Sequence, residues 1–240
     1  MFCNFTLKHY EEICNLIAKS QYKICFFNDC LDYEKLIILR HDIDAGIDQS
    51  FKIAKIENEY NLKSTFFLWL RSPFYNIFEK KYTDIIYNIV KLGHQIDLHF
   101  DESVYKIENE KDLNKFVKRE IKITEYYFYT NIYAVSMHRP SEWLLNNDIK
   151  LDKYINTYGK KFFKEFKYFS DSRRQWREGC ICKKIDVNRY DKLHILIHPF
   201  WWVDKDISFN KRMADFIRDK VNKLETDLEN NISVYKKNGN

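Results

Sequence analysis

The sequence predicts a single α/β domain, arranged as a parallel sheet or barrel with right-handed crossovers, and three observations lead to this prediction. Apolar strands alternate with amphipathic helices along the chain. Each predicted strand ends in polar side chains, as expected where parallel strands leave a sheet. The length of 240 residues suits one domain of barrel size. We expect one domain over 1–240, with an amino-terminal helical extension at 1–30 and a covering helix at 207–240.

The clearest predicted strand is the run 36–39, which is followed by Arg40, His41, Asp42 and Asp44. A continuous apolar run is typical of a parallel strand that is buried on both faces. Carboxylates at its end are costly unless they have a partner, a metal ion or a catalytic role. The simplest role for the two aspartates would be a strand-end cap with a salt bridge to Arg40.

Two helices and a second strand surround this run. Thr6 is the expected cap of a first helix that ends near Lys19 and serves as a lid or an outer helix. Gly46 begins the next helix, which ends near Tyr60. The aromatic and apolar run 64–70 then predicts the second strand.

The rest of the chain repeats the same order of helix and strand. A third helix begins at Thr83 or Asp84 and ends at Gly93, because glycine commonly ends helices. The remaining predicted elements are a strand at 94–100, a helix around 113–121, a strand at 134–137, a short helix and loop within 141–165, strands at 166–169 and 193–197, and a last helix capped by Ser208.

The overall charge gives little indication of a macromolecular partner. The chain carries a net charge of +5 without a long basic block or a recognition motif, so we expect no nucleic acid. A phosphate-bearing substrate or peripheral contact with an anionic membrane surface fits this charge. The amino terminus lacks the features of a signal peptide, and no apolar run approaches the ~20 residues of a membrane span. We therefore expect a cytoplasmic protein and have no indication of its oligomeric state.

The six cysteines match neither a zinc finger nor a disulfide framework, so reduced thiols are expected. Cys180 and Cys182 would share one face if they lay on a strand, but no further metal ligands stand beside them in the sequence.

Polar groups gather after five predicted strands, and packing does not explain them. They are HDID at 41–44, LHFD at 98–101, SMHRP at 136–140, SDSRRQW at 170–176 and IHPFWW at 197–202. Between about 36 and 202, the order and spacing of these motifs resemble the polysaccharide deacetylases of carbohydrate esterase family 4, the NodB-homology group. The closest likeness is to the divergent branch that opens with Arg-His-Asp-x-Asp.

This resemblance implies a distorted (β/α)7 TIM-like barrel and a divalent metal ion, usually Zn²⁺, held by one aspartate and two histidines. By position, Asp42 is the general base, Asp44 the metal-binding aspartate and His99 the first metal-binding histidine. The second histidine of the family motif is replaced here by Ser103.

Two histidines compete to complete the metal site. His138 follows a predicted strand and precedes the Arg-Pro pair of the family, and with Asp44 and His99 it would leave one position open for water. His94 is the alternative. If 94–99 is extended, however, His94 and His99 face opposite sides of the strand, which favours His138.

The resemblance assigns the remaining site residues to catalysis or to substrate binding. Arg139 is expected to orient the catalytic aspartate, and Asp171 to support His198, the acid that protonates the leaving amine. The substrate-binding surface is expected to contain Arg40, Trp176, Trp201 and Trp202, because aromatic faces pack well on sugars.

We therefore expect a metal-dependent carbohydrate N-deacetylase, a hydrolase of a linear amide bond. Its substrate would be an acylated amino sugar in a sugar nucleotide or lipid-linked glycan of surface polysaccharide synthesis. One alternative is a catalytically silent carbohydrate-binding barrel. Another is a deformylase, or a hydrolase of another small amide, on the same scaffold.

Overall fold

The computed structural model describes residues 3–30, 33–186 and 189–236. The chain divides into two compact units, Met1–Asp204 and Lys205–Asn240. The first unit contains the whole sheet. Its strands are β1 (Lys23–Ile24), β2 (Leu36–Ile43), β3 (Thr65–Leu68), β4 (Gln95–Phe100), β5 (Ala134–Met137), β6 (Ile155–Asn156), β7 (Lys167–Ser170) and β8 (Lys192–Ile197).

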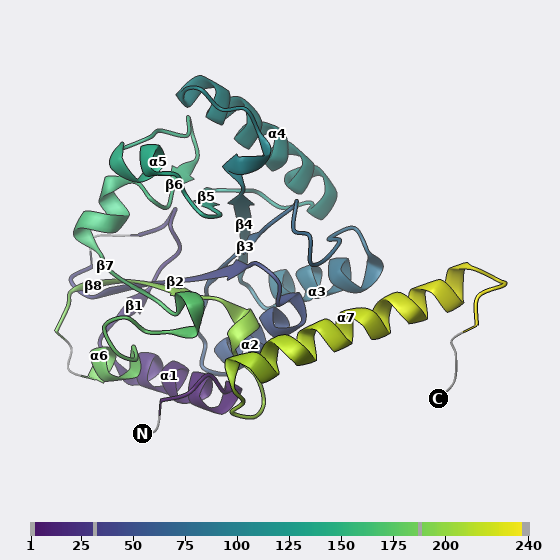
Figure 1. The fold of residues 1–240 in the computed structure, drawn as a ribbon. Helices are drawn as coiled ribbons and strands as arrows, with labels where there is room; N and C mark the ends of the chain where they lie inside the picture. The colour runs from purple at the N-terminus through teal and green to yellow at the C-terminus, as the bar shows by residue number, and fades with distance from the viewer. Residues whose placement is uncertain (1–2, 31–32, 187–188, 237–240) are drawn as a thin grey trace. The chain divides into compact units, whose positions relative to one another are not determined.

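The sheet is parallel throughout and curls into an open barrel (Figure 1). Seven strands run in the order β6-β5-β4-β3-β2-β8-β7. The eighth, β1, pairs with the start of β2, while β3 pairs with its end. This arrangement confirms the predicted distorted (β/α)7 barrel.

Among the described residues, the first unit contains six helices, of which α1 precedes the first strand and the other five lie between strands (Figure 1). They are α1 (Leu7–Lys19), α2 (Ile47–Glu59), α3 (Lys80–Lys91), α4 (Glu110–Phe128), α5 (Glu142–Asn146) and α6 (Cys182–Asp186). Short helical turns cover Glu102–Val104, Lys161–Glu165, Ser172–Arg174 and Pro199–Trp201.

The first helix lies on the outside of the sheet and is not a lid. The Thr6 hydroxyl caps α1 by accepting a hydrogen bond from the backbone of His9, as predicted. The buried face of α1, which includes Tyr10 and Ile13, packs into the same apolar cluster as the outer face of β2. Burial of this face holds the helix in place.

Alternation along β2 separates two environments. Leu36 and Ile38 belong to a cluster inside the barrel, whereas Ile37 and Leu39 belong to the outer cluster beneath the helices. Because side chains alternate along a strand, Arg40, Asp42 and Asp44 continue the inner series.

Several elements differ from the sequence prediction. The strands β1 and β6 were not expected, because two residues are too few to show a periodic pattern. Cys182 lies in a helix, so Cys180 and Cys182 do not share the face of a strand. α3 begins at Lys80, before the polar residues expected to start it.

The second unit contains α7 (Phe209–Asn231). Its cap is Ser208, whose hydroxyl accepts a hydrogen bond from the backbone of Lys211, as predicted. That this helix covers the barrel stays a prediction.

In the described parts of the chain, no helix is both long enough and apolar enough to cross a membrane.

A buried polar cluster joins α1, α2 and the outer face of the sheet around Glu57, which is fully buried. Its carboxylate accepts hydrogen bonds from Tyr10 at 2.5 Å and Ser64 at 2.6 Å, and it lies 2.8 Å from His41 Nε2. His94 lies 3.6 Å from the same carboxylate. Burial alone would raise the pKa of Glu57, but His41, His94 and Ser64 lower it to about 2.

We predict that Glu57→Gln destabilises the fold in a pH-dependent way. The folded state holds the pKa of Glu57 below the ordinary value of 4.5. The ionised carboxylate therefore stabilises the protein above about pH 4.5, and this contribution is lost as the pH falls towards 2. The free energy of unfolding should drop by about 3 kcal/mol at pH 7.

Chemical denaturation of both proteins between pH 7 and pH 3 measures this effect, and their difference should shrink below pH 4.5. Glu59→Gln is the matched control, because Glu59 is exposed on the same helix. A loss of stability in Glu57→Gln that does not change with pH would contradict the assignment.

Candidate active site

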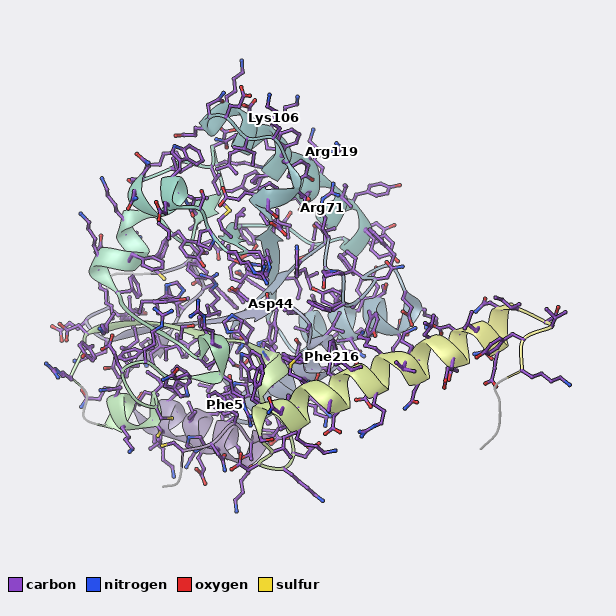
Figure 2. The ribbon with its side chains drawn as sticks, in the orientation of Figure 1. Phe5, Asp44, Arg71, Lys106, Arg119 and Phe216 are labelled. Carbon is purple, nitrogen blue, oxygen red and sulfur yellow. The ribbon has the colours of Figure 1, made fainter. Side chains whose placement is uncertain are left out.

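The candidate site lies at the carboxyl ends of the strands, on the inner side of the barrel. Asp44 lies just beyond the end of β2 (Figure 2). His99 is on β4, and His138 and His198 directly follow β5 and β8. Parallel strands place these groups at one edge of the sheet, although they are far apart in sequence.

Asp44, His99 and His138 form a compact triangle of ligand atoms. Asp44 Oδ1 lies 3.2 Å from His99 Nε2 and 3.4 Å from His138 Nδ1, and the two nitrogens are 3.2 Å apart. Asp44 Oδ1 is buried and has no hydrogen-bond partner within the residues that the structure describes. Burial alone would raise the pKa of Asp44, but the imidazoles of His138 and His99 hold it well below its usual range.

The three residues fit a divalent metal ion. A tetrahedral Zn²⁺ with bonds of about 2.0–2.1 Å separates its ligand atoms by about 3.3 Å, close to the spacing of this triangle. One carboxylate and two imidazoles are a common zinc donor set that leaves a position for water. The orphaned carboxylate oxygen is also explained by a cation.

His94 does not contribute to this triangle. Its Nε2 donates a hydrogen bond to the carbonyl of Ala54, and its Nδ1 accepts one from the backbone of Ser64. Burial lowers the pKa of His94, in keeping with a neutral structural histidine. Ser103 is also engaged elsewhere, since its hydroxyl donates to Asp101 at 2.6 Å.

Asp42 is held by a buried arginine, but by a different one from that expected. Arg40 donates to both carboxylate oxygens of Asp42, at 2.8 and 2.7 Å, and also to Thr157 and Tyr158. Burial alone would raise the pKa of Asp42, but Arg40 and nearby histidines lower it. The simple salt bridge that the sequence left open is therefore present, in the inner face of the barrel.

This geometry corrects two expectations. The contact with Asp42 expected of Arg139 is made by Arg40, while Arg139 is exposed and has a left-handed backbone with φ 51°. Arg40 is completely buried, so it cannot form part of the substrate surface.

Ser136 connects Asp42 to the triangle of Asp44, His99 and His138, and the sequence prediction missed it. Its hydroxyl lies 2.6 Å from His99 Nδ1 and donates to Asp42 Oδ1 at 3.4 Å. With His99 Nδ1 donating to Ser136, the lone pair of His99 Nε2 points to the triangle. The only signal in the sequence was its place in SMHRP, two residues before His138.

On the other side of Asp44, Asp171 organises the expected acid. One oxygen of Asp171 lies 2.6 Å from His198 Nδ1, and both accept from the His198 backbone. Burial alone would lower the pKa of His198, but Asp171 raises it to about 9. His198 Nε2 then faces the site, 3.9 Å from Asp44 Oδ2.

The three expected substrate-binding tryptophans have different environments. Trp202 is completely buried and donates to Asp171 at 2.9 Å, so it supports the acid and does not contact substrate. Trp176 and Trp201 are half-buried. Trp69, which the sequence did not distinguish from core aromatics, stacks on His138 with ring centroids 3.9 Å apart.

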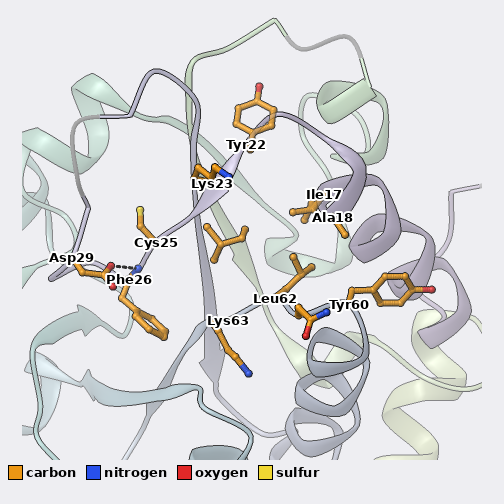
Figure 3. Close-up of a pocket in the computed structure, with 12 residues that line it drawn as sticks. Ile17, Ala18, Tyr22, Lys23, Cys25, Phe26, Asp29, Tyr60, Leu62 and Lys63 are labelled. Atoms are coloured by element: carbon orange, nitrogen blue, oxygen red, sulfur yellow. Dashed lines mark hydrogen bonds between the residues drawn. The ribbon is translucent and has the colours of Figure 1, made fainter.

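A separate pocket of about 580 Å³ opens between the end of α1, β1 and the end of α2 (Figure 3). Residues 60–63, which precede β3, and Lys23 of β1 line it. These residues lie at the amino ends of the strands, whereas Asp44 lies at the carboxyl ends. The pocket is therefore not part of the candidate site.

Comparisons with known proteins bear on the fold. No protein-family model and no curated protein sequence matches the chain. Among solved structures, a family 4 carbohydrate esterase pseudoenzyme from Bacillus anthracis matches with a TM-score of 0.50 and 12% identity. The match covers 78% of this chain and 62% of that one, so this chain spans less than two thirds of its length.

Two further structures match with lower TM-scores. A Streptococcus pyogenes deacetylase, solved with acetate, has a TM-score of 0.45 and 11% identity, covering 83% of this chain and 86% of that one. A chitin deacetylase from Colletotrichum lindemuthianum has a TM-score of 0.43 and 13% identity, covering 82% and 86%. The pseudoenzyme match, with its TM-score of 0.50, confirms the resemblance found in the sequence as a likeness of fold.

We predict that His138→Ala lowers the divalent metal content by one ion per chain, because it removes one corner of the triangle. The loss of a direct ligand should weaken binding by at least about 100-fold. Metal analysis after gel filtration, combined with titration of the apoprotein, measures this change.

His94→Ala is the control, since His94 is the competing histidine and has structural hydrogen bonds only. This variant should keep the metal content of the wild type while it remains folded by circular dichroism. Metal loss in His94→Ala with retention in His138→Ala would overturn the ligand set.

Proposed function

We propose that this protein is a metal-dependent N-deacetylase that hydrolyses the N-acetyl group of an amino sugar. The observation that carries the proposal is the combination of three groups around one edge of the barrel. These are the ligand triangle of Asp44, an anionic Asp42 and a cationic His198. The likeness of fold to a family 4 carbohydrate esterase pseudoenzyme supports the carbohydrate-esterase scaffold, and the three groups are the argument for turnover.

Asp44, His99 and His138 would hold the divalent ion, with Zn²⁺ the first candidate. When bound, such an ion polarises the amide carbonyl and makes water a better nucleophile. The protein itself fixes the donors: Ser136 orients His99, and the ring of Trp69 orients His138.

Asp42 is the group that removes a proton from water. Arg40 keeps the carboxylate ionised and fixes its plane through two hydrogen bonds. A low pKa makes Asp42 a weak base in bulk water, but its position against the site gives the transferred proton a short path.

His198 is the group that donates a proton to the leaving amine. Its Nδ1 proton is held by Asp171, so the proton on Nε2 is the one available to the site. The raised pKa keeps His198 protonated at neutral pH, as a general acid requires. Trp202 fixes the second oxygen of Asp171 and so prevents the carboxylate from turning.

We further propose that the amino sugar carries a phosphate, as in a sugar nucleotide or lipid-linked intermediate, and that the protein acts in the cytoplasm. Arg139 and Arg173 are exposed after β5 and β7, at the same end of the sheet as Asp44. Two cations on this rim suit a phosphate group.

Turnover assays would test the function and the substrate together. A nucleoside-diphosphate N-acetylhexosamine and a neutral N-acetylated oligosaccharide should be compared, with acetate and formate measured as products. Acetate from the first substrate supports the proposal, and formate would support the deformylase alternative. Saturable sugar binding without turnover by metal-loaded protein would support a silent carbohydrate-binding barrel, a role consistent with the pseudoenzyme of similar fold.

We predict that His198→Ala lowers kcat by about 10²–10⁴-fold, because it removes the proton donor. KM and metal content should change little, since His198 lies outside the ligand triangle. Steady-state kinetics with metal analysis measures this separation. His194→Ala is the control, since His194 is buried within β8, four residues before His198.

A further inference from the structure

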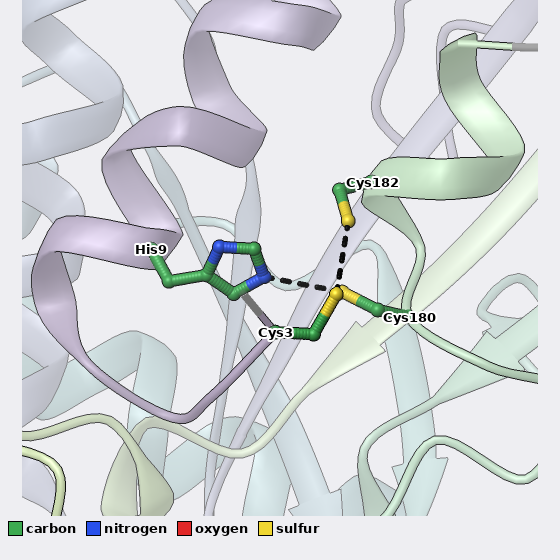
Figure 4. Close-up of side chains that lie close together, drawn as sticks. All are labelled: Cys3, His9, Cys180 and Cys182. Atoms are coloured by element: carbon green, nitrogen blue, oxygen red, sulfur yellow. Dashed lines mark hydrogen bonds between the residues drawn. The ribbon is translucent and has the colours of Figure 1, made fainter. Parts of the chain in front are cut away.

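A second cluster of potential metal ligands lies outside the candidate active site (Figure 4). Cys3 precedes α1, His9 is in the first turn of α1, Cys180 lies just before α6, and Cys182 begins it. Their four ligand atoms all lie within 4.8 Å of one another, although the chain separates the first two residues from the last two by more than 170 residues.

The spacing of these atoms suits a tetrahedral ion. Cys3 Sγ lies 3.6 Å from Cys182 Sγ, and His9 Nε2 lies 3.2 Å from Cys180 Sγ. Zn²⁺ with bonds of about 2.3 Å to sulfur and about 2.0 Å to nitrogen separates its ligands by about 3.5–3.8 Å. Small side-chain movements would therefore close the four groups around one ion.

His9 is oriented as a metal ligand. Its Nδ1 lies 2.8 Å from the carboxylate of Glu12, one turn further along α1. This contact places the ring proton on Nδ1 and directs the lone pair of Nε2 towards the cysteines. His9 is only 2% exposed, and Cys180 and Cys182 are buried as well.

Disulfide bonding explains this cluster less well. All six cysteines are free thiols, and three sulfurs cannot all be paired with one another.

We propose that Cys3, His9, Cys180 and Cys182 form a structural zinc site. Three thiolates and one imidazole form a closed donor set, which leaves no position for water or substrate. Each thiol releases its proton to solvent as it binds the ion. This proposal does not rest on the proposed function, because none of the four residues belongs to the candidate active site.

The site would join the segment of Cys3 and His9 to the segment that contains Asp171, the residue that holds His198. Cys180 ends the loop that begins at Asp171. On the other side, the ring of His9 stacks near Trp202, with centroids 6.3 Å apart, and Trp202 donates to Asp171. A zinc ion here would fix the loop between Asp171 and Cys180, and through His9 it would also fix the ring of Trp202. Asp171 would then be held from both sides.

Cobalt substitution tests the proposal on the full-length protein. Apoprotein titrated with Co²⁺ should show intense near-ultraviolet absorption from thiolate-to-cobalt charge transfer, which the Asp44, His99 and His138 triangle cannot give. Wild-type protein that binds Co²⁺ without this band overturns the proposal, and this result needs no variant.

Paired variants then assign the band to these residues. Cys180→Ser with Cys182→Ser should abolish the band, lower zinc content by one ion per chain and lower Tm. The matched control is Cys25→Ser with Cys30→Ser, which removes another close thiol pair whose sulfurs are 2.7 Å apart. A band that survives the first pair, or that disappears with the second pair, refutes the assignment.

His138→Ala separates the two metal sites. It should keep the cobalt–thiolate band while losing the ion of the candidate active site. Failure of the proposed function would leave the band unchanged, and failure of the zinc proposal would leave the turnover of metal-loaded enzyme unchanged.

Discussion

The buried ion pair between Arg40 and Asp42 is the interaction on which the rest of the site depends. Two charges inside a barrel lose much of their hydration, and only close pairing with further hydrogen bonds offsets that cost. Arg40 meets this condition by binding both oxygens of Asp42 and reaching Thr157 and Tyr158 beyond β6. The pair therefore ties β2 to the far edge of the sheet, and removal of either partner would leave an unpaired buried charge.

The alternation of side chains along β2 allows one strand to hold two buried polar systems. Asp42 faces the barrel interior and the candidate site. Its neighbour His41 faces outward, where it contacts Glu57 of α2. The first system contacts Arg40 and Ser136 inside the barrel, and the second attaches α1 and α2 to the sheet. A shift of one residue in the register of β2 would exchange the two faces, so the pairs with β3 and β8 specify the site as well as the fold.

Local signals in the sequence were sufficient to predict most helices and strands. They were not sufficient to predict contacts between distant segments. The caps at Thr6 and Ser208 and the apolar run of β2 depend on neighbouring residues, and the structure has all three. The two-residue strands β1 and β6 exist only through their pairing with other strands.

The site shows the same division between local and distant information. Motif order brought Asp44, His99 and His138 together correctly, yet it could not tell which arginine faces inward or that Trp202 is buried. Arg40 and Asp42 are two residues apart on one strand, so their side chains face the same side, and this spacing already indicated their contact. The sequence could not predict the cluster of Cys3, His9, Cys180 and Cys182, since its two halves are more than 170 residues apart and share no spacing rule.

The position of the second histidine follows from how β4 and β5 pair. His99 lies opposite Ser136 in the register, so His138, which directly follows β5 two residues beyond Ser136, projects on the same side one step closer to the rim. The backbone of His138 donates to the carbonyl of Phe100, which continues the ladder by one bond. A histidine on the neighbouring strand can thus replace one from the turn after β4, because Ser103 in that turn is held by Asp101. The pairing of the strands thus brings Asp44, His99 and His138 together, without a contribution from the turn after β4.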